Sequence, residues 1–310
     1  MARTAVVDIG TNTTRLLVAD VEDGVVHTLE RRSEVTRLGE GVDASGRLAD
    51  AAIDRVFAAV AEYRRTIDDL GAKVRVAVAT SAVRDAANGH ALLDRLREDL
   101  GLDARTISGD EEARLTFLGA THARSASGPL LVLDIGGGST EFVIGMPRSD
   151  PTFHVSTNAG SVRQTERHLT ADPPQPGQVA DLAEEVRGII AAAVPTDLRA
   201  GAGDGIAVAG TATTLAAIDQ EIDYRDARSV DGYRLELGAC ERMLALLAEL
   251  PLERRRRITG LHPDRAPTIV AGAVILVEAM RAFGFESMET SEADILQGAA
   301  LTANVANSSD

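Results

Sequence analysis

Short apolar runs and segments of helical periodicity alternate through the first 125 residues. Residues 4–10 form a β-branched run that ends at glycine, which is typical of a buried strand entering a tight turn. Apolar side chains between residues 48 and 70 recur near one helical face, and Gly71 follows as a stop signal. The same criteria predict further strands at residues 15–21, 25–29, 74–79 and 105–108, and further helices at residues 91–100 and 111–123. This order predicts an α/β layered domain.

A second segment with the same alternation begins near Pro129. Its pattern predicts strands at residues 130–136, 141–144 and 205–209, and helices at residues 179–193, 240–250 and 269–283. Three prolines in residues 170–178 predict a loop. At about 100–200 residues per domain, a chain of 310 residues is expected to form two domains. We place them at residues 1–125 and 126–292.

A repeat links the two segments. Asp8-Ile-Gly-Thr-Asn-Thr-Thr-Arg15 aligns with Asp134-Ile-Gly-Gly-Gly-Ser-Thr-Glu141, an offset of 126 positions (134 − 8). Each copy reads as a strand, an acidic residue, a turn of small polar residues and a second strand. We therefore expect two similar strand–turn–strand units that face one ligand across a cleft.

The turns of this repeat suit the binding of phosphate. Glycine, serine and threonine can present successive backbone amides and hydroxyls, and such concave clusters of N–H groups bind phosphate oxygens. An aspartate at the end of a strand can hold Mg²⁺, directly or through water. Alternatively, Gly-Gly-Gly-Ser is only a flexible turn, but the second copy and the acids at Asp8, Asp134 and Glu141 favour the functional interpretation.

The net charge and the residue composition argue against several classes of function. The chain carries 32 Lys and Arg against 47 Asp and Glu, a net charge of −15, which argues against a protein that coats nucleic acid or an anionic membrane. Lys73, the one lysine, lies outside any Walker-type phosphate loop, and the one cysteine, Cys240, excludes an internal disulfide or a cysteine-based zinc site. Neither a signal peptide nor a membrane-spanning stretch is apparent, so we expect a cytoplasmic protein.

Four motifs, in order, resemble those of a known family. They are Asp8-Ile-Gly-Thr-Asn-Thr-Thr-Arg-Leu16, Ala79-Thr-Ser-Ala-Val-Arg-Asp85, Ile107-Ser-Gly-Asp-Glu-Glu-Ala-Arg-Leu115 and Asp134-Ile-Gly-Gly-Gly-Ser-Thr-Glu141. The chain resembles the Ppx/GppA family of exopolyphosphatases and guanosine pentaphosphate phosphohydrolases, especially its short, two-domain, actinobacterial members. That resemblance implies two ribonuclease-H-like domains of the actin-like ATPase superfamily flanking a cleft, with a C-terminal helix at about residues 293–310 that packs back on the first domain.

The resemblance also implies roles for matching positions. Glu112 matches the base that activates the attacking water, with Glu111 as the alternative. Asp134 and Glu141 match positions that hold the divalent ion, Mg²⁺ or Mn²⁺, and Asp8 is the symmetric candidate. Arg84 matches a substrate-binding arginine, although it could instead pair locally with Asp85. The predicted phosphate-binding residues are Gly10, Thr11, Asn12, Thr13, Arg15, Arg84, Gly136, Gly137, Gly138 and Ser139.

The implied activity is Mg²⁺-dependent exopolyphosphatase, which releases orthophosphate from the ends of inorganic polyphosphate. The nearest alternative is hydrolysis of the 5′ γ-phosphate of guanosine pentaphosphate at the same site. An ATPase or sugar kinase of the same superfamily, or a catalytically silent sensor of polyphosphate or alarmone, are further alternatives. The expected partners are polyphosphate or guanosine pentaphosphate, with no nucleic acid and no membrane, and the family also suggests a homodimer. The run Arg254-Arg-Arg-Arg257 could guide a polyanion, but a solvated helix end is the commoner meaning.

Overall fold

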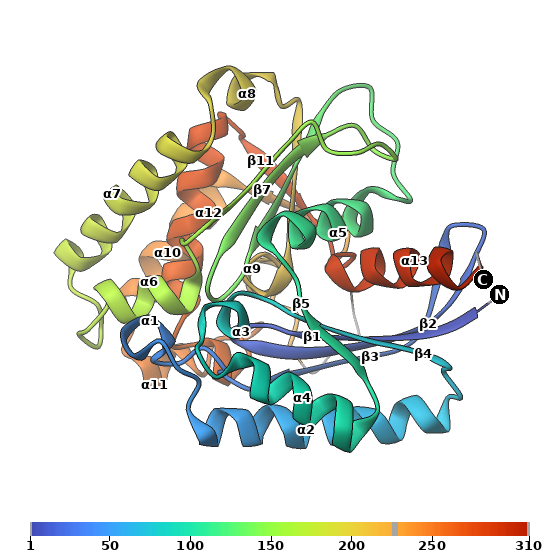
Figure 1. The fold of residues 1–310 in the computed structure, drawn as a ribbon. Coiled ribbons are helices and arrows are strands. Elements are labelled where there is room, and N and C mark those ends of the chain that lie inside the picture. Colours follow the sequence, from blue (N-terminus) through green and yellow to red (C-terminus); the bar gives the residue numbers. More distant parts are fainter. Residues whose placement is uncertain (1, 225–228, 309–310) are drawn as a thin grey trace. The chain divides into compact units, whose positions relative to one another are not determined.

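The computed structural model describes residues 2–224 and 229–308. Unit 1 comprises Met1–Arg124 and Asp294–Asp310, and unit 2 comprises Ser125–Ala293. Each unit has a β-sheet of its own, flanked by helices (Figure 1). The last helix of the chain belongs to unit 1, as the family resemblance implies, and residues 309 and 310 at its predicted end lie outside the described residues.

Unit 1 is an α/β domain on a five-stranded sheet. Its strands are β1 (Ala2–Ile9), β2 (Thr13–Glu22), β3 (Val25–Val35), β4 (Val74–Ala79) and β5 (Asp103–Thr106). Its helices are α1 (Val42–Ser45), α2 (Asp50–Asp69), α3 (Ser81–Asp85), α4 (Gly89–Leu100), α5 (Gly109–Thr121) and α13 (Ile295–Ser308). The strand order is β3-β2-β1-β4-β5, in which β1 is antiparallel to β2 and parallel to β4.

Two apolar cores cover the two faces of this sheet. Alternate residues of β1 face opposite sides, as the pleat requires. Val7 and Ile9 join the core formed with α2 and α4, whereas Val6 joins the core formed with α5 and α13. Asp8 shares the face of Val6, so its carboxyl group lies on the side covered by the C-terminal helix.

Unit 2 has a six-stranded sheet. Its strands are β6 (Leu130–Ile135), β7 (Thr140–Gly145), β8 (Phe153–Thr157), β9 (Asp204–Val208), β10 (Arg234–Glu236) and β11 (Ser287–Thr290). Its helices are α6 (Ser161–His168), α7 (Pro176–Ala193), α8 (Thr196–Gly201), α9 (Ala209–Asp219), α10 (Leu237–Glu249), α11 (Leu252–Arg255), α12 (Ile269–Phe283) and a 3₁₀ turn at Pro263–Arg265. The strand order is β10-β11-β9-β6-β7-β8, and a single apolar core joins it to α7, α9, α10 and α12.

Both sheets have the same topology. In each unit three strands form an antiparallel meander, and two later strands add in parallel beside the first strand of that meander. The correspondence runs from β1, β2, β3, β4 and β5 to β6, β7, β8, β9 and β11, with β10 as an extra edge strand. This arrangement confirms the predicted pair of ribonuclease-H-like domains.

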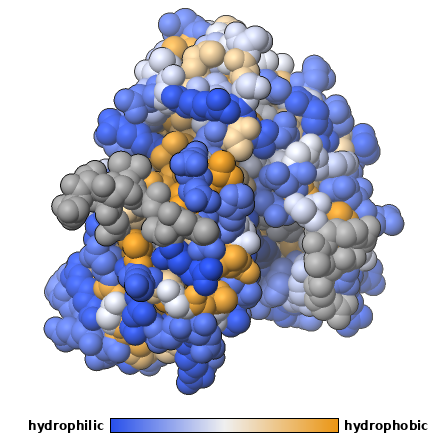
Figure 2. Space-filling model, turned by 90° about the vertical axis from the view of Figure 1, so that its right-hand side faces the viewer, coloured by the Kyte–Doolittle hydropathy of each residue, from blue (hydrophilic) through white to orange (hydrophobic). Residues whose placement is uncertain are grey.

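Polar residues dominate the face of the molecule drawn in Figure 2, and apolar residues appear there in small areas between them. Within the described residues, no helix combines the length and the apolar character needed to cross a membrane.

Several short elements differ from the sequence-based expectations. Residues 209–219 form α9, which the pattern did not reveal because six of its residues, mostly alanine and threonine, are buried and no polar face marks a period. Helix α7 begins at Pro176 rather than at residue 179, because proline is well suited to the first helical position. Strand β3 extends to Val35, beyond the predicted end at residue 29. The pattern missed this extension because the exposed, charged residues there show no apolar alternation.

Candidate active site

The first turn of the repeat is closed by its own backbone. The Gly10 amide donates to the Thr13 carbonyl at 3.0 Å. The carbonyls of Thr11 and Asn12 accept from the amides of Gly39 and Arg37, at 2.8 and 2.9 Å. Within the described residues, the amides of Thr11 and Asn12 themselves have no hydrogen-bond partner. The turn therefore keeps two backbone donors for an external acceptor.

The second turn repeats this geometry in unit 2. The Gly136 amide donates to the Ser139 carbonyl at 3.0 Å. The carbonyl of Gly137 accepts from the amide of Val162, at the start of α6, at 2.8 Å. In the part of the chain that the structure describes, the amides of Gly137 and Gly138 lack a partner. Both predicted phosphate-binding turns thus have their carbonyls occupied and their middle amides available, which is the arrangement that binds anions.

The acidic residues of the repeat occupy equivalent positions but different surroundings. Asp8 lies opposite Arg15 across β1 and β2, whereas Asp134 lies opposite Glu141 across β6 and β7. Asp134 and Glu141 are both buried, and the Ser156 hydroxyl donates to Glu141 Oε1 at 2.7 Å. Two buried carboxylates side by side suit a hard divalent cation, which would relieve their repulsion.

An ion bound by Asp134 and Glu141 would need further ligands. Within residues 2–224 and 229–308, no group of three or more His, Cys, Asp or Glu side chains converges as a metal site. Asp134 and Glu141 supply two carboxylates, and a divalent ion bound there would complete its coordination with water or phosphate oxygens. The donor set therefore fits Mg²⁺ or Mn²⁺ as a partly water-coordinated ion.

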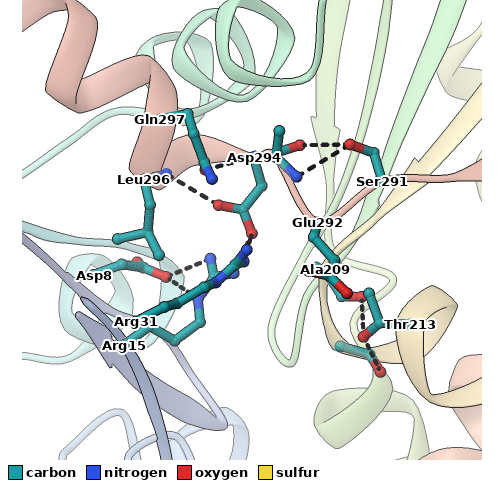
Figure 3. A network of polar contacts seen from close by, with 12 residues as sticks. Asp8, Arg15, Arg31, Ala209, Thr213, Ser291, Glu292, Asp294, Leu296 and Gln297 are labelled. Atoms are coloured by element: carbon teal, nitrogen blue, oxygen red, sulfur yellow. Dashed lines mark hydrogen bonds and ion pairs between the residues drawn. The ribbon is translucent and has the colours of Figure 1, made fainter. Parts of the chain in front are cut away.

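Asp8 takes part instead in a buried charge network within unit 1 (Figure 3). Arg15 donates to Asp8 Oδ2 through Nε at 2.9 Å and Nη2 at 2.6 Å, and through Nη1 to Asp294. Arg31 adds a second cation, 3.6 Å from Asp294 Oδ2. Arg15, predicted to bind phosphate, therefore has its guanidinium turned towards two carboxylates.

The pKa values of the two acids of this network shift in opposite directions. Burial raises the pKa of Asp8, and the charge of Arg15 offsets only part of that rise. Burial also works to raise the pKa of Asp294, but Arg15 and Arg31 outweigh it and hold that pKa below its ordinary value. Asp8 Oδ1 is buried and lacks a partner among the described residues. Asp8 Oδ1 could therefore accept a hydrogen bond or a cation.

The two neighbouring glutamates at the start of α5 face different environments. Glu111 is partly exposed and pairs with Arg105, Nη1 to Oε2, at 2.9 Å. Glu112 is buried, and Arg84 Nη1 donates to its Oε2 at 3.1 Å and to the Ile107 carbonyl at 3.0 Å. The structure thus brings the predicted base and a predicted substrate-binding arginine together, while the other glutamate has its own surface partner.

Two features near the candidate site, Asp294 and helix α6, were not predicted from the sequence. Asp294 joins the Arg15 network, and it also begins α13 with a reciprocal cap, in which its amide donates to Gln297 Oε1 and its Oδ1 accepts from the Leu296 amide, both at 3.0 Å. An acid three residues before a glutamine is a readable capping signal. Helix α6 supports the second turn through the amides of Ser161 and Val162, which donate to the carbonyls of Gly136 and Gly137.

Comparisons with known proteins identify the family of this chain. The Ppx/GppA phosphatase family matches residues 17–301. "Exopolyphosphatase 2" of Mycobacterium tuberculosis is 36% identical over 320 aligned positions, covering 97% of this chain and 98% of that protein. The crystal structure of an exopolyphosphatase-like protein superposes with a TM-score of 0.90 at 34% identity, covering 97% of both chains. A Ppx/GppA family member from Aquifex aeolicus gives 0.82 at 28% identity, covering 99% of this chain and 98% of that one.

Proposed function

Because the chain belongs to the Ppx/GppA phosphatase family, we propose that it is an exopolyphosphatase that hydrolyses the terminal phosphoanhydride bond of inorganic polyphosphate and releases orthophosphate. The observation that carries this proposal is the repeated turn, because each copy leaves two adjacent amides for phosphate oxygens. A similar protein of nearly the same length is named an exopolyphosphatase, which favours polyphosphate over guanosine pentaphosphate as the substrate.

The proposed reaction needs little covalent chemistry from the protein. The amides of Gly137 and Gly138 donate to phosphate oxygens, and the amides of Thr11 and Asn12 offer the same donors. Glu112 orients a water and takes its proton as the water oxygen attacks the terminal phosphorus. The bond from that phosphorus to the bridging oxygen breaks, and the shortened chain leaves with the electron pair.

Asp134 and Glu141 would hold the divalent ion, which supplies charge neutralisation on the phosphate oxygens when it is bound. Arg84 positions the Glu112 carboxylate through the 3.1 Å hydrogen bond and fixes itself on the Ile107 carbonyl. A base held in this way needs no reorientation before the attack, which is the benefit of a preorganised site.

The matched pair Glu112→Gln and Glu111→Gln tests the proposed base. Phosphate release from polyphosphate by purified protein with Mg²⁺ should fall by about 10²–10⁴-fold in Glu112→Gln, the usual contribution of a general base. The neighbouring Glu111→Gln variant should keep activity within about threefold of the wild type, because that carboxylate is already paired with Arg105. Full activity in Glu112→Gln would show that another group is the base.

A comparison of substrates tests the specificity. We expect kcat/KM for polyphosphate to exceed that for guanosine pentaphosphate by at least about tenfold, or about 1.4 kcal/mol. A larger kcat/KM for the nucleotide would replace the proposed substrate. Absence of turnover on both, together with measurable polyphosphate binding, would identify a sensor instead.

A further inference from the structure

Helix α6 contacts the backbone of the second turn at several points. Its first amides donate to turn carbonyls, from Ser161 to Gly136 at 2.9 Å and from Val162 to Gly137 at 2.8 Å. Arg163 Nε donates to the Gly138 carbonyl at 2.9 Å. A Cβ atom at the preceding residue, Gly160, would lie 2.3 Å from the Gly137 oxygen, so the two backbones are in direct contact. A turn of three consecutive glycines therefore takes its shape from α6.

Helix α6 has few apolar anchors of its own. Its sequence, Ser161-Val-Arg-Gln-Thr-Glu-Arg-His168, contains a single apolar residue, Val162. It packs beside α7 and α12 (Figure 1). A short helix with so little hydrophobic burial depends on polar contacts for its position, because apolar burial supplies most of the stability of other helices.

Glu185 of α7 supplies these polar contacts. Its Oε1 accepts from Gln164 Nε2 at 3.2 Å and from Arg167 Nη1 at 3.3 Å. Its Oε2 lies 2.7 Å from His168 Nε2. One carboxylate thus contacts three side chains in the last turns of α6.

Removal of the Glu185 carboxylate would leave a buried neighbour without its hydrogen bond. Gln164 is fully buried, and its Oε1 has no partner within the described residues, so its amide depends on Glu185 for a hydrogen bond. Burial works to raise the pKa of Glu185, but the hydrogen bonds of Gln164 and His168 outweigh it and lower that pKa. The carboxylate is therefore charged at neutral pH.

Helix α7 is a firm support for Glu185. Three of its residues, Leu182, Val186 and Ile190, are at most 1% exposed and belong to the main core of unit 2. Their spacing places one face of α7 in that core, and Glu185 lies beside this face. A displacement of the Glu185 backbone would therefore require α7 to leave its packing.

We propose that Glu185 is a positioning residue for the phosphate-binding turn, because it fixes α6 to α7 and α6 in turn fixes the backbone of residues 136–139. This inference rests on the proposed function for its kinetic effect, since the turn must bind phosphate for its shape to matter. Its structural half, the dependence of α6 on Glu185, can be measured without any substrate.

The test uses Glu185→Ala, Glu185→Gln and, as a matched control, Glu184→Ala. Glu184 is the adjacent carboxylate on α7 and is exposed to solvent. In Glu185→Ala we expect KM for polyphosphate to rise about tenfold, because a loosened turn loses phosphate contacts made in both the ground and transition states. Partial unfolding would instead lower the apparent kcat and leave KM unchanged. Glu185→Gln keeps a hydrogen-bond acceptor and should recover most of the affinity.

Hydrogen exchange provides the second measurement. The amides of residues 161–163 donate to the turn, so they should exchange at least about tenfold faster in Glu185→Ala and at the wild-type rate in Glu184→Ala. Unchanged exchange and unchanged KM in Glu185→Ala would overturn the inference. If the wild-type protein releases no phosphate from polyphosphate, the proposed function fails, and the exchange rates alone then decide whether Glu185 holds α6.

Discussion

At the residue scale, Arg15 in the first copy of the repeat stands where Glu141 stands in the second. A guanidinium opposite Asp8 neutralises that acid inside unit 1, and Asp294 shares the same guanidinium. A carboxylate opposite Asp134 doubles the negative charge in unit 2. At this position of the repeat, the chain therefore places a guanidinium opposite the strand-end acid in unit 1 and a second carboxylate opposite it in unit 2.

Loss of Arg15 should destabilise unit 1 strongly. Arg15→Gln leaves the buried carboxylates of Asp8 and Asp294 without their main cation, so we expect the free energy of unfolding to fall by about 3–5 kcal/mol. Urea denaturation followed by circular dichroism measures it. The exposed pair of Arg32 and Glu30 supplies the control, because Arg32→Gln should cost less than about 1 kcal/mol. Equal losses in both variants would contradict the structural role of the network.

Glu141 should contribute to cation affinity. Replacing one of two adjacent carboxylates in Glu141→Gln halves the negative charge offered to the ion, so Mn²⁺ affinity should fall by at least about tenfold. Electron paramagnetic resonance of free Mn²⁺ during titration gives this affinity directly. Unaltered Mn²⁺ binding in Glu141→Gln would place the ion elsewhere.

The candidate site was only partly predictable from the sequence. The turns and the acids at Asp134 and Glu141 are visible because each lies within one short motif. Asp294 is not, because it reaches Arg15 from 279 positions away, and Glu185 reaches α6 from a different helix. The catalytic and metal-binding roles themselves stay predictions.

At the scale of elements, α5 and α13 cross at two glycines. A Cβ on Gly298 would lie 1.9 Å from the Leu115 carbonyl oxygen, and one on Gly119 would lie 1.8 Å from the Asp294 carbonyl oxygen. Each helix thus presents a glycine to the backbone of the other. This close approach fixes the start of α13, where Asp294 holds Arg15.

An added methyl group at this crossing should lower the free energy of unfolding. In Gly298→Ala the two helix backbones must separate, and we expect a loss of about 1–3 kcal/mol in the free energy of unfolding. Gly188 lies within α7 with no atom within 4 Å of its would-be Cβ, so Gly188→Ala should raise stability by about 0.5–1 kcal/mol. Thermal denaturation of the two variants compares them, and a stabilised Gly298→Ala would refute the close crossing.

The Arg105–Glu111 pair at the start of α5 should make the free energy of unfolding depend on pH. Arg105 donates hydrogen bonds that lower the pKa of Glu111, although burial opposes this. A lowered folded-state pKa means that the pair stabilises the protein above the ordinary carboxyl pKa and that this contribution disappears as pH falls through the lowered value. The stability difference between the wild type and Glu111→Gln should therefore shrink between about pH 5 and pH 3. Denaturation midpoints measured across this range test the sign, and a difference that grows on acidification would be contrary to it.

The elements themselves show what a pattern can reveal. The strand predicted at residues 130–136 and the helix at 269–283 are confirmed, because apolar runs that end at glycine leave little ambiguity. The strand predicted at residues 74–79 is confirmed as well. Strands β10 and β11 were not predicted, because segments of three or four residues contain too few positions to show apolar alternation. Helix α3 escaped because it is a single turn with three buried residues and no polar period.

At the scale of the whole molecule, the two units share one sheet topology but differ in the segments that support their turns. The 126-residue offset places the two turns at the same position in each sheet, after the first strand of the meander. Unit 2 adds α6 beneath its turn, whereas residues 37–39 support the turn of unit 1. The duplicated backbone is thus predictable from the repeat, but the different supports are not.

The net charge of −15 makes a cation important for a polyanionic substrate. We expect removal of divalent ions by EDTA to abolish phosphate release and added Mg²⁺ to restore it. Phosphate assays on the same sample before and after the addition measure both effects. Undiminished turnover in EDTA would exclude the proposed role of the ion.

Helix α13 has a consequence for biosynthesis. Its residues Ile295, Leu296 and Ala300 fill the core beneath β1 and β2, which are made almost 300 codons earlier on the ribosome. Until α13 has been made, one face of the nascent unit 1 sheet is covered only by α5, while the contiguous unit 2 can fold as it emerges. A ribosome that stalls shortly before this helix would release a chain with one finished unit and one whose sheet exposes apolar residues beside α5, a ready substrate for chaperones and proteases.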